Sequence, residues 1–144
     1  MMQTDLELAK QRLGQENLSL VIAKKGRVLF ETQARGISGL LEAIKKIGKN
    51  IRDSSVADRI VGRAAALLLV YSGVTSVYAV TISDGGIEVL KNLNILSEFD
   101  KRVPNILNLK KTDVCPFEKL VAKVSDPKEA YETLKACCTP KQAL

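Results

Sequence analysis

The alternation of apolar and polar residues divides the first part of the chain into a helix and a hairpin. Thr4 and Glu7 form a capping box, in which each side chain satisfies an orphan backbone donor. They predict a short amphipathic helix that ends near Arg12. Two β-rich runs follow, at 18–24 and 27–32, separated by two residues that include a glycine. That spacing predicts a β-hairpin.

The middle of the chain carries its most apolar segment. Ser38 is placed to cap a helix over 39–47, whose leucines and isoleucines form an apolar stripe that Gly48 ends. The run DRIVGRAAALLLVYSG, from Asp58 to Gly73, is apolar almost all round. It predicts a helix buried at the centre of the domain, with Asp58 as its N-cap.

The following segments alternate between extended and helical patterns. A β-branched run at 76–82 predicts a central strand, residues 83–86 a turn, and residues 87–92 a short helix. A further strand is predicted at 95–99. Because strands and helices alternate, we expect an α/β fold with a mostly parallel sheet.

The last part of the chain predicts two more helices. Pro116 suits a first helical position, which places Cys115 at the start of one helix. An acidic cap at residue 126 opens the other, which should end near Ala136. With 46% hydrophobic and 26% charged residues, the chain is expected to form one packed domain over 1–136, with 137–144 as a flexible tail.

The net charge of the chain is positive but is spread along the sequence. Twenty-two Lys and Arg against 16 Asp and Glu give +6, which attracts polyanions weakly at low salt. Aromatic residues make up only 4% and Trp is absent, so the stacking platforms of single-strand binders are missing. Because the basic residues form no stripe either, nucleic acid is not the expected partner.

The sequence favours the cytoplasm. Its start carries Asp5 and Glu7 where a secretory signal would have an apolar segment. No apolar run approaches the roughly 18 residues that a membrane span needs. Three cysteines, an odd number with two of them adjacent, do not make a disulfide framework and suit a reducing compartment.

Three stretches resemble a family of small uncharacterised prokaryotic proteins, a domain of unknown function with a cytidine deaminase-like fold. They are VADRIVGRAAALLLVYSGV, VPNILNLKKTDVCPFEKLV and DPKEAYETLK, of which DRIVGRAAA and CPFE are the most specific pieces. The similarity runs from about Leu18 to Lys135. It implies a three-layer sandwich in which a mixed sheet begins with a β-hairpin and packs against a buried central helix. Because that family has no assigned activity, the resemblance implies no reaction.

The zinc-binding motifs of cytidine deaminases are absent from the sequence. Those enzymes carry H-x-E or C-x-E at the start of the buried helix and P-C-x-x-C after the central strand, so that three ligands hold the metal while Glu moves protons. This chain has no His, and its 83–86 turn has no Cys. Cys115, Cys137 and Cys138 are not spaced to replace the missing ligands. We therefore expect no metal, no cofactor and no zinc-dependent deaminase activity.

Cys115 is the sharpest candidate for chemistry. A thiol at a helix N-terminus faces the positive end of the helix dipole, which favours the thiolate, and Lys110 and Lys111 could reinforce that effect. The alternative is a small buried hydrophobe, which free cysteines usually are. Without His, only a carboxylate such as Asp58 or Glu118, or a lysine, could act as its base.

Two further groups of residues are candidates for binding a ligand. Asp58 and Arg63, in the first turns of the predicted buried helix, could hold a polar ligand, or could be an N-cap and an ion pair. Glu118 could equally stabilise its own helix dipole. The turn with Ser83, Asp84 and Gly85 follows a strand of the sheet, where backbone N–H groups could cradle an anion, although an ordinary turn explains it equally well.

Three hypotheses of function follow from these candidates. The first is a domain that binds a small molecule, nucleotide-like or otherwise anionic, at Asp58, Arg63, Ser83, Asp84 and Cys115. The second is a metal-free enzyme in which Cys115 is the nucleophile and Asp58 or Glu118 handles protons. The third is a structural module that assembles into homo-oligomers.

Overall fold

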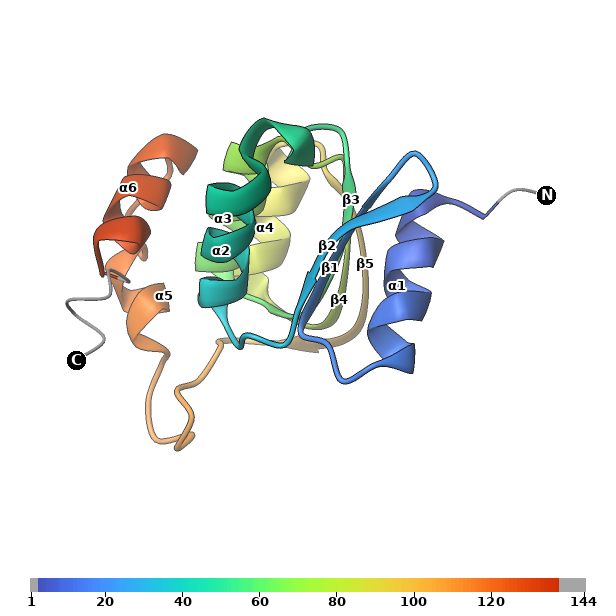
Figure 1. Cartoon of the computed structure of the whole chain (residues 1–144). Helices are drawn as coiled ribbons and strands as arrows, with labels where there is room; N and C mark the ends of the chain where they lie inside the picture. Colours follow the sequence, from blue (N-terminus) through green and yellow to red (C-terminus); the bar gives the residue numbers. More distant parts are fainter. Residues whose placement is uncertain (1–2, 138–144) are drawn as a thin grey trace.

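A five-stranded mixed sheet forms the middle layer of the molecule (Figure 1). The computed structural model describes residues 3–137. The strands lie in the order β2-β1-β3-β4-β5, and β3, β4 and β5 run parallel while β1 is antiparallel to both of its neighbours. Their bounds are β1 Leu20–Lys24, β2 Arg27–Thr32, β3 Ser55–Val61, β4 Ser76–Ser83 and β5 Leu96–Val103.

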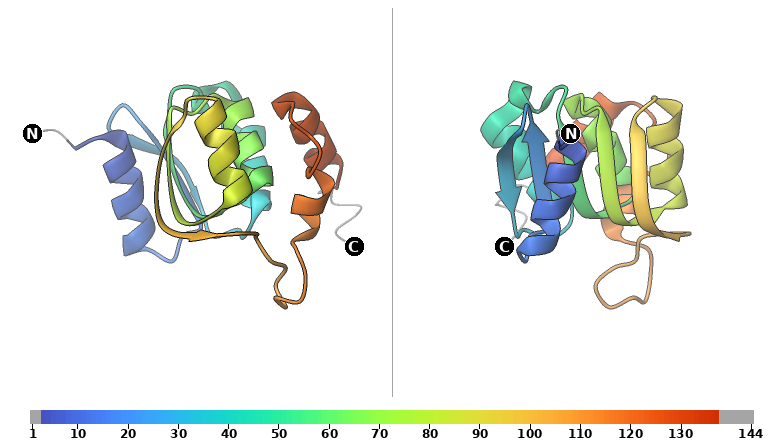
Figure 2. Two further views of the ribbon diagram at one scale, coloured as in Figure 1. Left: turned by 180° about the vertical axis from the view of Figure 1, so that it is seen from behind. Right: turned by 90° about the vertical axis from the view of Figure 1, so that its right-hand side faces the viewer.

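Helices cover the two faces of the sheet unequally. One face carries α1 alone, and the other carries α2, α3 and α4, with α5 and α6 packed beyond α3 (Figures 1 and 2). This arrangement is a mixed α/β sandwich. The helices are α1 Asp5–Gln15, α2 Ile37–Ile47, α3 Arg63–Ser72, α4 Asp84–Asn92, α5 Pro116–Leu120 and α6 Pro127–Cys137, with a short 3-10 helix, η1, at Gly48–Ile51.

The N-cap of the first helix and the hairpin turn are confirmed, whereas α1 runs to Gln15, beyond its predicted end near Arg12. The Thr4 hydroxyl accepts a hydrogen bond from the Glu7 N–H at 3.0 Å and so caps α1. The hairpin turn is made by Lys25 and Gly26, which both have positive φ, at 53° and 78°. Both of their N–H groups donate to the Asp5 carboxylate, so α1 and the hairpin hold each other in place.

The predicted cap of α2 is wrong. The N-cap is Gly36, at φ 64°, and no side chain caps this helix. The Ser38 hydroxyl instead donates to the carbonyl of Arg35. Gly48 does end the helix, as its position after the apolar stripe predicts.

The start of the buried helix is also wrong, and Asp58 is not an N-cap. Residues 55–61 form strand β3, and the helix begins five residues after Asp58, at Arg63. The segment pairs with β1 on one side and β4 on the other, and this pairing in the centre of the sheet outweighs the helical pattern of its neighbours. The predicted burial of the helix holds, because six of the ten residues of α3 are buried. Gly73 ends it in the left-handed conformation, as predicted.

The predicted turn at 83–86 is the first turn of α4. Helix α4 begins at Asp84, directly after the last residue of β4, and includes both glycines. The strand that follows α4 in the chain, β5, runs from Leu96 to Val103 and so ends four residues beyond the predicted end. Strands β5 and β2 are the two edges of the sheet, and most side chains of β5 are exposed.

Hydrophobic residues pack on both faces of the sheet. The larger core lies between the sheet and α2, α3 and α4, and extends to α6 through Ala130 and Leu134. The smaller one lies under α1 and includes Leu13, Val21 and Tyr78. Among the described residues, no helix is both long and apolar enough to cross a membrane. Cys137 ends α6, whereas the rest of the predicted tail lies outside the described residues.

Candidate functional site

The N-termini of α3 and α4 meet at the carboxyl edge of the parallel strands. Only Gly62 separates β3 from α3, and no residue separates β4 from α4. A Cβ on Gly86 would lie 2.8 Å from the carbonyl oxygen of Val61, which is too close for any side chain. Glycine at position 86 therefore allows the two helix starts to lie against each other.

Glu118 caps the N-terminus of α3 from a distant part of the chain. Its two carboxylate oxygens accept hydrogen bonds from the N–H groups of Arg63 and Ala64, each at 2.8 Å. A Cβ on Gly62 would lie 2.2 Å from the nearer of these oxygens. The absence of a side chain at Gly62 thus leaves the space that the carboxylate fills, at the end of the helix where a negative charge is favourable.

The Arg63 guanidinium ties the same segment to α3. It donates from Nε to the carbonyl of Val121 at 2.9 Å and from Nη2 to the carbonyl of Val124. Because arginine has five N–H donors, these two bonds leave others for a further partner. Arg63 is therefore both an anchor for the chain after α5 and a fixed positive charge.

Ser83 and Asp84 have local partners at the start of α4. The buried Ser83 hydroxyl accepts a hydrogen bond from the Gly86 N–H at 3.0 Å and caps the helix. Asp84 forms an ion pair with Arg102 of β5, with 2.7 Å between Oδ1 and Nε. Gly85 faces α3, since a Cβ at this position would lie 3.5 Å from the Cβ of Arg63. Gly85 thus lies beside Arg63, and the side chains of Ser83 and Asp84 already have partners.

Asp58 is buried in the interior of β3. It is 7% exposed, its Oδ1 accepts a long hydrogen bond of 3.4 Å from the Ile60 N–H, and among residues 3–137 no lysine or arginine forms an ion pair with it. Burial raises the pKa of this carboxyl to about 7, against which hydrogen bonds from backbone N–H groups act only partly. Asp58 has no hydrogen bond to Arg63, Glu118 or Cys115.

Cys115 precedes α5 and is half-buried. Its backbone N–H donates to the carbonyl of Ile106 at 2.9 Å, and its own carbonyl accepts from Lys119. The position before Pro116 is the predicted one, but α5 has only five residues. Cys115 lies in the segment that packs over the start of α3, three residues before Glu118. Among the described residues, its thiol forms no hydrogen bond to a carboxylate that could act as its base.

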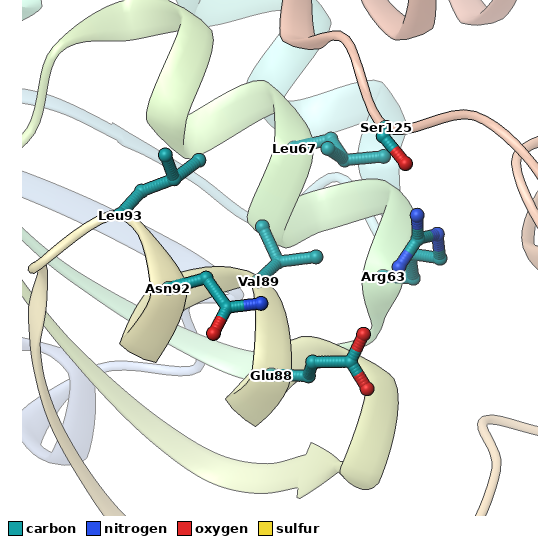
Figure 3. A pocket seen from close by; sticks show the side chains of 7 residues that line it. All are labelled: Arg63, Leu67, Glu88, Val89, Asn92, Leu93 and Ser125. Carbon is teal, nitrogen blue, oxygen red and sulfur yellow. The ribbon is translucent and has the colours of Figure 1, made fainter.

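A cavity of about 210 Å³ lies between α3, α4 and the connection from α5 to α6 (Figure 3). Arg63 and Glu88 lie at one end of it and Asn92 and Leu93 at the other. Of the seven predicted site residues, Arg63 alone lines it. The full lining is Arg63, Leu67, Glu88, Val89, Asn92, Leu93 and Ser125.

Sequence reasoning missed Glu88, Asn92 and Ser125. Glu88 and Asn92 are four residues apart in α4 and so share one helix face, a spacing that could have marked them as neighbours. Ser125 comes from the connection before α6 and has no such signal. A second hollow, of about 460 Å³ on the other side of α4, contains Lys91 as its one charged residue. Within the described residues, no three His, Cys, Asp or Glu side chains gather closely enough to hold a metal ion.

These features define a small α/β protein with a mixed five-stranded sheet and a cavity against its central helix. The chain belongs to the DUF1893 family, because the model of that domain of unknown function matches residues 8–137. A crystal structure of a DUF1893 family protein from Thermotoga maritima has a similar fold, with a TM-score of 0.81. The two proteins share 26% sequence identity, over 94% of this chain and 92% of that one. A search of curated proteins finds no match.

Proposed function

We propose that this protein binds a small, partly anionic molecule in the cavity between α3 and α4. The observation that carries the proposal is Arg63, whose guanidinium is held in place by two backbone carbonyls and still lines the cavity. A positive charge that is fixed before binding favours an anionic group at little cost in side-chain entropy.

The other lining residues suggest the remaining chemistry of the ligand. Glu88 accepts hydrogen bonds, so it suits amino or hydroxyl groups, and the Asn92 amide can both donate and accept. Leu67, Val89 and Leu93 offer an apolar surface for a ring. At roughly 30 Å³ per water molecule, 210 Å³ has the volume of about seven waters, which suits a small metabolite or one part of a nucleotide.

A ligand screen by thermal unfolding tests this proposal. The panel should contain nucleosides, nucleotides, sugar phosphates and small carboxylates, because a ligand at a hundred times its dissociation constant adds roughly 2.7 kcal/mol of stability. We expect at least one anionic compound to raise the unfolding temperature of the wild-type protein.

Paired variants locate the site of any hit. The double variant Glu88→Gln/Asn92→Ala removes exposed lining groups without touching the anchors of Arg63, and it should weaken binding at least tenfold. Glu132→Gln, on the exposed surface of α6, is the matched control and should leave the affinity unchanged. The proposal would be contradicted if no compound raised the unfolding temperature. It would also be contradicted if the double variant bound the active compound as tightly as the wild type and the control do.

We also propose that the fold is cytidine deaminase-like. The order of helix, hairpin, helix and then alternating strands and helices supports this assignment, as does the start of α3 and α4 at one edge of the sheet. Zinc deaminases carry their metal ligands at such helix starts. Here the corresponding positions are Gly62–Ala64 and Ser83–Gly86.

The absence of zinc deaminase activity has a direct assay. Incubation with cytidine, adenosine and their deoxy forms, with and without added Zn²⁺, should release no ammonia. Zinc-dependent release that survives further purification would overturn the proposal and would require ligands other than those of the zinc deaminases.

A nucleophilic role for Cys115 stays a prediction that the geometry does not favour. Glu118, one of the two carboxylates considered as its base, uses both oxygens on backbone N–H groups and is poorly placed to move protons. An alkylation rate typical of an ordinary thiol, with a pKa of about 8.5, would count against the enzyme hypothesis. Light scattering of the purified protein would measure whether the chain assembles into homo-oligomers.

A further inference from the structure

Segments that carry basic residues meet at the end of the molecule opposite the N-termini of α3 and α4. The hairpin turn at 24–27, the end of α2, η1 and the start of the connection to β3 lie at this end, as all views of the ribbon show (Figures 1 and 2). Lys24 joins the two parts, because its Nζ donates to the carbonyl of Asn50 at 3.4 Å. We name this surface the basic corner, and it consists of Lys24, Lys25, Arg27, Lys45, Lys46, Lys49 and Arg52.

The basic corner holds most of the net charge of the chain. Its seven basic residues are accompanied by Glu42 and Asp53, and by Asp5, whose carboxylate binds the hairpin turn. Seven positive and three negative charges leave +4, out of +6 for the whole chain. Charge that is dispersed along the sequence is therefore concentrated by folding.

Most of these charges are available to a partner. Six of the seven side chains are exposed, and Lys24 is half-buried. Within residues 3–137, Lys46 is the one member with an ion pair, to Glu42 at 4.0 Å. Lys45 and Lys46 also lie in the last turn of α2, and Lys49 in that of η1, where a positive charge is favourable.

We propose that the basic corner binds the phosphate backbone of duplex nucleic acid without reading its sequence. The corner contains no aromatic residue, so it cannot stack single-stranded bases. None of its seven members offers an apolar anchor for a bilayer or a protein partner, because all of them are lysine or arginine. A lysine-rich surface without apolar groups matches a regular array of phosphates, which is bound through charge alone.

The sequence disfavours nucleic acid for two reasons, the shortage of aromatic residues and the dispersal of basic residues along the chain, and folding removes the second. The shortage of aromatic residues remains and excludes a stacking mode. The dispersal of basic residues does not survive folding, because segments 24–27 and 45–52 meet in space. Binding to the phosphate backbone needs basic residues that lie close together, and it does not need aromatic residues.

The test is fluorescence anisotropy of a labelled 24-base-pair duplex of random sequence, titrated with the full chain between 20 and 200 mM salt. Binding should be saturable at low salt. With five contacted phosphates, the slope of log K against log salt should be about −4.5. No saturable binding at 20 mM salt would overturn the proposal.

Variants with matched charge show where the duplex binds. Lys45→Glu/Lys49→Glu should weaken binding at least tenfold and reduce the salt slope by about 2. Lys110→Glu/Lys111→Glu changes the net charge equally on an exposed loop elsewhere and should weaken binding less than threefold. Equal weakening by both pairs would mean non-specific attraction by net charge, and would overturn the proposal.

Two further measurements exclude other partners and misfolding. Tighter binding to phosphatidylserine vesicles than to the duplex, lost in the same corner variant, would assign the surface to lipid instead. Lys25→Gln/Arg27→Gln, at the tip of the hairpin, gives an independent corner variant if reversal of charge disturbs α2. Because none of these residues lines the cavity, these results do not depend on the proposed ligand site.

Discussion

The two helices that start at the carboxyl edge of the sheet are capped in opposite ways. Helix α4 is capped by Ser83, the residue directly before it. Helix α3 has Gly62 at the same position and takes its cap from Glu118, which lies more than fifty residues later in the sequence. The same physical need, partners for unpaired N–H groups, is met once locally and once by tertiary structure.

This difference makes the start of α3 part of a larger unit. Glu118 holds its backbone N–H groups, while the Arg63 side chain binds carbonyls just after α5. The segment that closes the end of α3 also forms one wall of the cavity, through Ser125. A change that loosens this segment from α3 should therefore also change the shape of the cavity.

The largest expected effect tests whether Asp58 belongs to the strand or caps the helix. In the unfolded chain its carboxyl ionises at its ordinary pKa of 3.8, whereas burial raises the pKa to about 7 in the fold. The folded state therefore keeps the proton between these values, and its contribution to stability is lost as pH rises from about 4 to 7. Asp58→Asn should raise the free energy of unfolding by up to about 4 kcal/mol at pH 8, with no difference below pH 4.

Urea unfolding of both proteins at pH 4, 6 and 8 measures this effect. Asn caps a helix as well as Asp does, so a true N-cap would give nearly equal stabilities at every pH. A pH-independent result would mean that the carboxyl of Asp58 titrates normally in the fold.

The second prediction removes the distant cap of α3. Glu118→Gln replaces one acceptor oxygen by an amide that faces an N–H group, and should cost about 3 kcal/mol, given 1.5–3 kcal/mol for a hydrogen bond to a charged group. Gly62→Ala should cause a similar loss by pushing the carboxylate away. Hydrogen exchange of the Arg63 and Ala64 amides should accelerate in both variants.

A surface glutamate provides the control for this cap. Glu132→Gln, on the exposed face of α6, should change stability by less than about 0.5 kcal/mol. If Glu118→Gln lowers the free energy of unfolding as little as this control does, hydrogen bonds from water must stabilise the start of α3 as well as the carboxylate does.

The third prediction concerns the local cap of α4. Ser83→Ala removes one hydrogen bond to the Gly86 N–H and should cost about 1 kcal/mol, which is typical of an N-cap serine. Chemical denaturation would measure it. A cost larger than that of Glu118→Gln would reverse the order of the two caps.

The smallest effect separates the two glycines of α4. A Cβ at Gly85 would make ordinary contacts, at 3.5 Å or more, so Gly85→Ala should stabilise the protein by up to about 1 kcal/mol through helix propensity. Gly86→Ala, with its contact of 2.8 Å to the carbonyl of Val61, should destabilise it. Thermal unfolding of the pair would show whether the helix starts are as close as described.

The sequence predicts those elements whose signals are local. The Thr4 cap, the Lys25–Gly26 turn and the Gly73 stop depend on residues adjacent to the elements that they bound, and all three are confirmed. Strand β3 is missed because its short apolar run continues into the helical pattern, and only pairing with β1 and β4 distinguishes it.

The candidate site is predicted less completely, for the same reason. Arg63 and Glu118 are both named from the sequence, but neither the pairing of Glu118 with the start of α3 nor the cavity beside Arg63 follows from spacing. Such contacts join residues more than fifty positions apart, and their geometry depends on the path of the chain between them.

The position of α3 under α5 and α6 has a consequence for folding. The ring of Tyr71 on α3 stacks on that of Tyr131 on α6, with 4.4 Å between centroids, and the cap at Glu118 lies nearby in sequence. A chain emerging from the ribosome therefore has its central helix in place, but with one side uncovered, until the last helix has been synthesised. Completion of the fold should wait for these contacts of long sequence separation, so the nascent chain would expose an apolar helix during that interval.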